Sequence, residues 1–175
     1  MAKKKEIVKS NVALIGFMAT GKTSVGRLLA ASLDKKFIET DSIIRSMAGK
    51  SIGRIFAEDG ELRFRELEMQ AVARASRRRN VVISCGGGVI YNKINIDRLK
   101  TTSRVVLLTA SKKAIIERAE QDRRARPILS MAKKRNGIDA LIAFRKPLYE
   151  AYADFAVDTT NATIAEAADR VLRKL

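Results

Sequence analysis

Short runs of apolar and β-branched residues alternate along the chain with longer amphipathic segments. The five runs are Asn11 to Ile15, Lys36 to Glu39, Asn80 to Ser84, Arg104 to Leu108 and Asp154 to Val157. Continuous apolar runs of this length are typical of strands that are buried on both faces of a parallel sheet. We therefore predict a strand at each of them.

The segments between these runs have apolar residues at intervals of three and four, which is the spacing of one helix face. Val25, Leu28, Leu29 and Leu33 share such a face. Thr163 is placed to cap a last helix, whose apolar residues are Ile164, Ala167, Ala168, Val171, Leu172 and Leu175. Alternating strands and helices predict right-handed β-α-β crossovers, so the fold class is α/β, a parallel sheet with helices on both sides.

The composition fits one domain, residues 1–175, without internal repeats. Hydrophobic residues make up 46% and charged residues 31% of the chain, which is ordinary for a globular protein and excludes a disordered one. The apolar runs are far shorter than the ~20 residues of a membrane helix. We expect a cytoplasmic protein that does not interact with membranes.

The net charge of +16 is the one compositional oddity. It permits nucleic acid as a partner, but the basic runs at Arg77 to Arg79, Arg123 to Arg124 and Lys133 to Arg135 are scattered. Aromatic residues that could stack on bases make up only 5%. We favour solvated faces and helix ends for these cations, and expect no specific nucleic acid.

The chain has no histidine, and Cys85 is its one cysteine. Neither a Cys-His pair nor a Ser-His triad can be built, which excludes hydrolases of those kinds. We interpret Cys85 as a small buried hydrophobic residue rather than a nucleophile.

A phosphate-binding loop follows the first predicted strand. Gly16 to Thr23 matches the pattern G-x-x-x-x-G-K-[ST] and opens a helix, as the motif requires. Backbone N–H groups of such a loop face phosphate oxygens, the lysine reaches the β and γ phosphates, and the hydroxyl binds Mg²⁺. We predict ATP and Mg²⁺ as ligands, with contacts from Gly16, Ala19, Thr20, Gly21, Lys22, Thr23 and Ser24.

Two stretches resemble neither a sheet strand nor a core helix. They are residues 48–61, with three glycines, and residues 121–137, rich in arginine and lysine. In a phosphotransferase such excursions hold the acceptor and form a mobile lid.

Further motifs follow the loop in order. They are Phe37-Ile-Glu-Thr-Asp41, Gly49-Lys-Ser-Ile-Gly53 with Ile55-Phe56, Gly60-Glu-Leu-Arg-Phe-Arg65 with Glu68, Gly86-Gly-Gly88-Val89, Arg126-Pro-Ile-Leu129 and Arg145-Lys-Pro-Leu-Tyr149. This ordered set resembles shikimate kinase over nearly the whole chain. The resemblance implies ATP-dependent phosphorylation of the 3-hydroxyl of shikimate, on the pathway to chorismate and aromatic amino acids. It also implies the fold of small nucleoside-monophosphate kinases, with a five-stranded parallel sheet, a lid near 121–137 and a shikimate-binding region near 41–68. We expect a monomer.

The resemblance also assigns the acceptor site. Arg65 and Arg145 match the family positions that clamp the carboxylate, and planar guanidinium groups suit that anion. Asp41 matches the aspartate that binds the acceptor hydroxyls, although it could also be a helix N-cap. Gly86, Gly87 and Gly88 would let a ring approach the backbone, with a tight structural turn as the alternative.

On the nucleotide side, Arg126 matches the arginine that meets the transferring phosphate, and Arg118 matches one that packs on adenine. Residues 157–159 resemble the adenine-contacting loop. The family has Asp-x-Asp where this chain has Glu39-Thr-Asp41, so Glu39 would hold Mg²⁺ through water with a longer arm. Ser84 matches a position near the metal's water shell.

Two alternatives stay open on the residues alone. One is a kinase for another polyol acid or a nucleotide, since gluconate and nucleoside-monophosphate kinases share the loop and architecture. The other is a nucleic-acid-binding or regulatory protein that has kept the fold without the reaction. The net charge of +16 favours this alternative.

Overall fold

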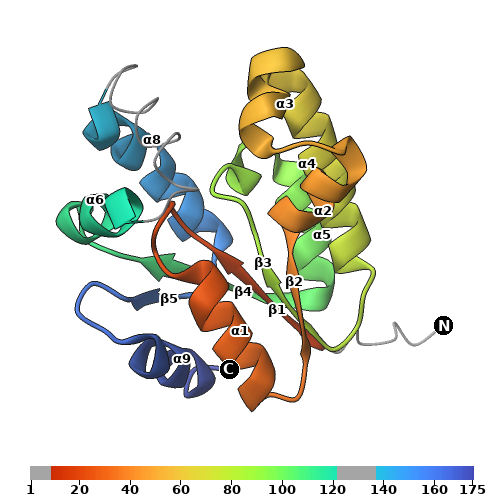
Figure 1. Cartoon of the computed structure of the whole chain (residues 1–175). Coiled ribbons are helices and arrows are strands. Elements are labelled where there is room, and N and C mark those ends of the chain that lie inside the picture. Colours follow the sequence, from red (N-terminus) through yellow and green to blue (C-terminus); the bar gives the residue numbers. More distant parts are fainter. Residues whose placement is uncertain (1–8, 122–136) are drawn as a thin grey trace, which may run out of the picture.

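Five parallel strands form a sheet in the order β2-β3-β1-β4-β5 (Figure 1). This is a computed structural model, and it describes residues 9–121 and 137–175. The strands are β1 (Asn11–Ile15), β2 (Lys36–Glu39), β3 (Val81–Ser84), β4 (Ser103–Thr109) and β5 (Phe155–Asp158). Each predicted strand is confirmed to within one residue at either end, and so is the α/β class.

Burial of the strands depends on their place in the sheet. β1 and β3 are buried at every residue and β4 at most of them, as predicted for strands covered on both faces. β2 and β5 lie at the two edges and are only partly covered. The prediction of double-sided burial was therefore wrong for the edge strands, because a run of apolar residues does not reveal the strand order.

Helices α1 (Lys22–Ser32) and α9 (Ile164–Leu172) cover one face of the sheet. Val25 and Leu29 are buried there, whereas Leu28 is 37% exposed, so the predicted α1 face is narrower than expected. In α9 the inner face consists of Ala167, Ala168 and Val171, while Ile164 is exposed. The predicted Leu175 is also exposed and lies beyond the end of α9 at Leu172. Thr163 caps α9 in a full capping box with Glu166, which confirms the predicted cap.

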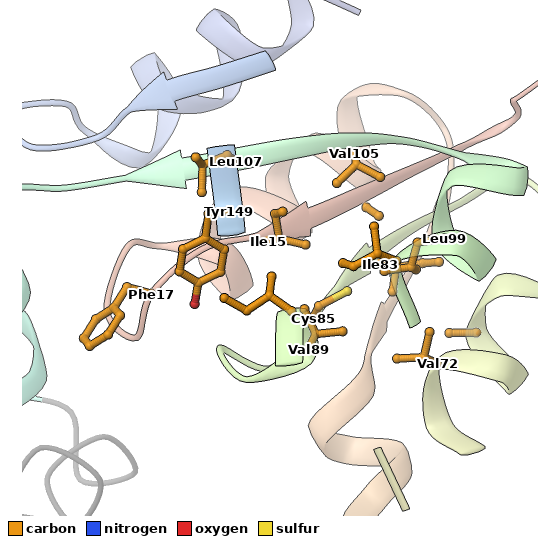
Figure 2. Packing of buried hydrophobic residues seen from close by; sticks show 14 of the residues in the cluster. Ile15, Phe17, Val72, Ile83, Cys85, Val89, Leu99, Val105, Leu107 and Tyr149 are labelled. Carbon is orange, nitrogen blue, oxygen red and sulfur yellow. The ribbon is translucent and has the colours of Figure 1, made fainter. Parts of the chain in front are cut away.

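The opposite face is covered by α4 (Gly60–Ser76), α5 (Lys93–Thr102), α6 (Lys112–Gln121) and α8 (Gly137–Tyr152). Figure 2 shows this cluster, in which Ile15, Ile83 and Val105 of the sheet meet Val72, Leu99 and Tyr149 of the helices. Cys85 belongs to it and is 2% exposed. Burial raises the pKa of its thiol, so the interpretation of Cys85 as an inert hydrophobic residue is confirmed.

A smaller helical unit stands beside β2 (Figure 1). It consists of α2 (Thr40–Ala48), α3 (Ile52–Glu58) and the start of α4, packed around Ile44, Ile55 and Phe64. The sequence of residues 48–61 resembled neither a strand nor a core helix because of its glycines, but the stretch contains helix α3. Gly49 and Gly60 have positive φ angles of 66° and 80°. Gly49 caps the end of α2 and Gly60 begins α4, so both lie outside α3 and do not disrupt it.

Candidate active site

The loop after β1 has the backbone that a phosphate cradle requires. Gly16 and Gly21 have φ angles of 143° and 91°, and a Cβ on Gly16 would overlap the carbonyl oxygen of Leu108. Ala19 also has a positive φ, 58°. Thr20 is buried and its hydroxyl donates to the carbonyl of Phe17 at 2.9 Å, which closes the loop on itself. The loop leads into α1, whose N-terminal N–H groups favour an anion.

Lys22 folds back over this loop. Its ammonium donates to the carbonyls of Gly16 at 2.8 Å and Phe17 at 2.6 Å, and only 9% of the residue is exposed. Burial lowers the Lys22 pKa to about 8, although the nearby Asp41 carboxylate acts in the opposite direction. The Lys22 ammonium is thus held against two carbonyls of the loop. Ser24, in the same first turn of α1, is exposed.

The two strongest candidate metal ligands contact each other. The Thr23 hydroxyl donates to Oε1 of Glu39 at 2.8 Å, while Ser42 donates to Oε2 of Glu39 at 2.8 Å. Arg45 lies 3.5 Å from the same Oε2. Ser84 ends β3 opposite Glu39 in the sheet register. Oxygen atoms of this kind suit Mg²⁺, and the part of the chain described contains no cluster of three Cys, Asp or Glu residues that could hold a metal by itself.

Gly86 brings the end of β3 against the acidic residues. A Cβ on Gly86 would lie 2.7 Å from Oδ1 of Asp41 and 3.5 Å from Oε1 of Glu68. The Gly86 N–H donates to the Thr40 hydroxyl at 3.0 Å, which ties the end of β2 to the end of β3. Asp41 lies in the first turn of α2, whose N-cap is Glu39, so the alternative that Asp41 caps this helix is wrong.

The other two glycines lie under the two predicted arginines. A Cβ on Gly87 would lie 3.6 Å from Nη1 of Arg145 and 3.6 Å from the Gly16 carbonyl. A Cβ on Gly88 would overlap Nη1 of Arg65. The glycine triplet therefore adjoins the phosphate loop, Asp41 and both arginines, which come from four other segments of the chain. This convergence favours a ligand site over a tight turn alone.

Arg65 is held by two carboxylates. Its guanidinium contacts Glu68 at 2.9 Å and Glu61 at 3.1 Å. Glu68 is 1% exposed, and burial raises its pKa against the opposing effect of Arg65. Breaking a buried ion pair of this kind is costly, because it leaves a desolvated charge. Arg65 is thus anchored before any ligand arrives.

Two tyrosines complete the site, and sequence reasoning gave neither a role. The Tyr149 hydroxyl donates to the Gly87 carbonyl at 2.5 Å, and Tyr91 accepts from Nε of Arg145 at 2.6 Å. Burial raises the pKa of Tyr149, so it stays a neutral donor. Glu68 and Tyr149 belong to the motifs that resemble the family, so those motifs could have indicated them. Tyr91, three residues after the glycine triplet, belongs to no motif that would indicate a role in the site.

Arg118 joins the phosphate loop to the segment after β5. It donates to the carbonyls of Thr159 at 2.6 Å, Thr160 at 3.0 Å and Ala19 at 3.4 Å. The structure thus brings together the residues predicted to meet the adenine. Arg126 and most of the predicted lid lie outside the described residues.

Within residues 9–121 and 137–175, no helix is both long and apolar enough to cross a membrane.

The basic run Arg77 to Arg79 follows α4 and precedes β3. It therefore lies at the N-terminal end of a strand, opposite the end that carries the site.

Comparisons with known proteins agree with this arrangement. The family model described as shikimate kinase matches residues 18–175. A shikimate kinase of Caldanaerobacter subterraneus subsp. tengcongensis is 40% identical over 163 residues, covering 93% of this chain and 94% of the relative. The structure of shikimate kinase from Acinetobacter baumannii in complex with shikimate has a TM-score of 0.88 and 30% identity, covering 99% of this chain and 96% of that chain. A gluconokinase from Sinorhizobium meliloti, at 18% identity and a TM-score of 0.53, shares the fold alone.

Proposed function

The chain belongs to the shikimate kinase family, and on that premise we propose that the residues around the glycine triplet bind shikimate and receive the γ-phosphoryl group of ATP on its 3-hydroxyl. The reaction is ATP-dependent phosphorylation of shikimate, a step of aromatic biosynthesis. One observation carries the site assignment: Gly86, Gly87 and Gly88 adjoin Asp41, Arg145 and Arg65 in turn, with the phosphate loop beside Gly87.

The acceptor would be held from two sides. Arg145 and Arg65 offer guanidinium groups to the carboxylate, and Asp41 accepts hydrogen bonds from the ring hydroxyls. With its own hydroxyl oriented toward the phosphate loop, the acceptor needs little activation, since the transition state of phosphoryl transfer is loose. Positioning then supplies most of the acceleration.

On the donor side, Lys22 would move from the Gly16 and Phe17 carbonyls onto the phosphates. Its positive charge would there offset the negative charge that develops on the phosphates during transfer. Thr23 would hold Mg²⁺ directly, with Glu39 and Ser84 acting through water. The ion would neutralise phosphate charge. Arg118 would contact the adenine and Arg126 the transferring phosphate.

The separate core of α2, α3 and α4 supports a shikimate-binding region near 41–68. We further propose a lid near 121–137, a monomeric state and a cytoplasmic location. Size-exclusion chromatography with light scattering tests the monomer; a mass near twice 19.4 kDa would refute it.

The deciding experiment is ADP release from ATP and Mg²⁺, with shikimate, quinate, gluconate and nucleoside monophosphates offered separately. Turnover that depends on shikimate and is lost in Lys22→Ala is expected. Arg145→Ala should raise the shikimate KM, and Asp41→Asn should lower kcat. Turnover with gluconate or a nucleotide instead would contradict the proposal.

A further inference from the structure

Tyr91 contacts both arginines of the site. Nε of Arg145 donates to the Tyr91 hydroxyl at 2.6 Å. The guanidinium carbons of Arg65 and Arg145 lie 4.9 Å and 5.0 Å from the centroid of the Tyr91 ring. Both are within the range of cation–π attraction, so one aromatic side chain interacts with two cations that come from different helices.

The hydrogen bond to Tyr91 uses Nε of Arg145 rather than its two terminal amino groups. Nε of Arg145 donates to Tyr91, and the Arg145 side chain also forms a hydrogen bond with the Tyr149 side chain. The two terminal amino groups are the pair that suits a carboxylate, and Nη1 lies close to Gly87. Arg65, in contrast, gives Nε, Nη1 and Nη2 to Glu61 and Glu68. Tyr91 thus binds Arg145 at Nε, an atom that a forked contact through the two terminal amino groups does not need, and this hydrogen bond restrains the plane of the guanidinium.

Two neighbouring guanidinium groups repel each other before a carboxylate arrives. Glu68 and Glu61 offset the charge of Arg65. Arg145 lies over the Tyr91 ring and also 5.3 Å from the ring centroid of Phe17. The π faces of these rings offset part of its charge without adding a carboxylate that would compete with the ligand.

The backbone around Tyr91 is well anchored. Val89 and Ile90 are buried in the main core, and the Tyr91 N–H donates to the Gly88 carbonyl at 3.0 Å. Asn92 follows as the N-cap of α5 and accepts from the Ile94 N–H. Tyr91 therefore extends from a short rigid turn, the η1 segment (Val89–Tyr91).

We propose that Tyr91 is a positioning residue of the carboxylate site, holding the Arg145 guanidinium by Nε and bringing it beside Arg65 over the glycine triplet. The inference rests on the proposed function. Tyr91 acts through Arg145 and need not touch the substrate.

The test compares Tyr91→Phe, which removes the hydroxyl and keeps the ring, with Tyr152→Phe as a matched control. Tyr152 lies on α8 and packs against the main core rather than the site. Loss of a hydrogen bond to a charged group predicts about a tenfold higher shikimate KM for Tyr91→Phe. The ATP KM and kcat should stay within about twofold of wild type, and Tyr152→Phe should match wild type.

A double-mutant cycle separates positioning from a general structural role. If Tyr91 acts through Arg145, Tyr91→Phe should add little to the shikimate KM of Arg145→Ala. An unchanged shikimate KM in Tyr91→Phe, equal effects on both substrates, or full additivity with Arg145→Ala would each overturn the inference. If the wild-type chain fails to turn over shikimate, the proposed function fails instead, and the two failures are distinguishable.

Discussion

Gly88→Ala is the substitution whose effect follows most directly from the geometry. Gly88 has φ −90° and ψ 0°, which alanine can adopt, so the backbone is not the obstacle. The added methyl would overlap Nη1 of Arg65. Since the backbone is held by the core residues Val89 and Ile90, the Arg65 side chain is expected to move.

The magnitude follows from what Arg65 would lose. Nη1 is the atom that meets Oε2 of Glu68 at 2.9 Å, and Glu68 is 1% exposed. A hydrogen bond to a charged group contributes about 1.5–3 kcal/mol. Because Nη2 can keep its contact with Glu61, we expect the free energy of unfolding to fall by an amount in the lower part of this range. Displacement of Arg65 from the carboxylate site should raise the shikimate KM about 10- to 100-fold.

The assay is steady-state kinetics with each substrate varied in turn, together with thermal unfolding. Gly53→Ala is the matched control for thermal unfolding, because Gly53 lies inside α3 and a Cβ there meets no atom within 4 Å. Alanine in a helix interior is favoured by roughly 0.5–1 kcal/mol, so this control should be neutral or slightly stabilised. A wild-type shikimate KM in Gly88→Ala, or an equal rise in the ATP KM, would refute the reasoning.

Three further predictions concern other parts of the molecule. Since the Lys22 pKa is lowered to about 8 and the protonated form binds phosphate, kcat/KM for ATP should fall above about pH 8; a profile flat to about pH 9.5 would exclude Lys22 as the titrating group. Glu39→Gln should raise the Mg²⁺ concentration for half-maximal activity about tenfold, as for other outer ligands, and an unchanged Mg²⁺ titration would remove Glu39 from the metal site. With Arg77 to Arg79 away from the site, DNA binding should be weak at about 0.15 M salt; tight binding that weakens steeply with salt would support the nucleic-acid alternative.

The site could be predicted in its parts. Gly16 to Thr23 carries a motif whose backbone requirements are local, and the motif order placed Asp41, Arg65, the glycine triplet and Arg145 in one site. Their roles stay predictions. Glu68 and Tyr91 received no role, because nothing local distinguishes a glutamate that is buried by packing or a tyrosine that meets an arginine 54 positions away.

The sequence by itself determined the strands, the capped last helix, the phosphate loop and the family. The strands, the cap and the loop depend on residues a few positions apart, so a period or a motif records each of them, and the order of such motifs along the chain indicates the family. The tertiary structure alone decided which strands lie at the edges, that α3 forms within a glycine-rich stretch, and that Tyr91 meets both arginines. Those outcomes depend on the order β2-β3-β1-β4-β5 and on contacts between segments far apart in the chain, which no local pattern of residues encodes.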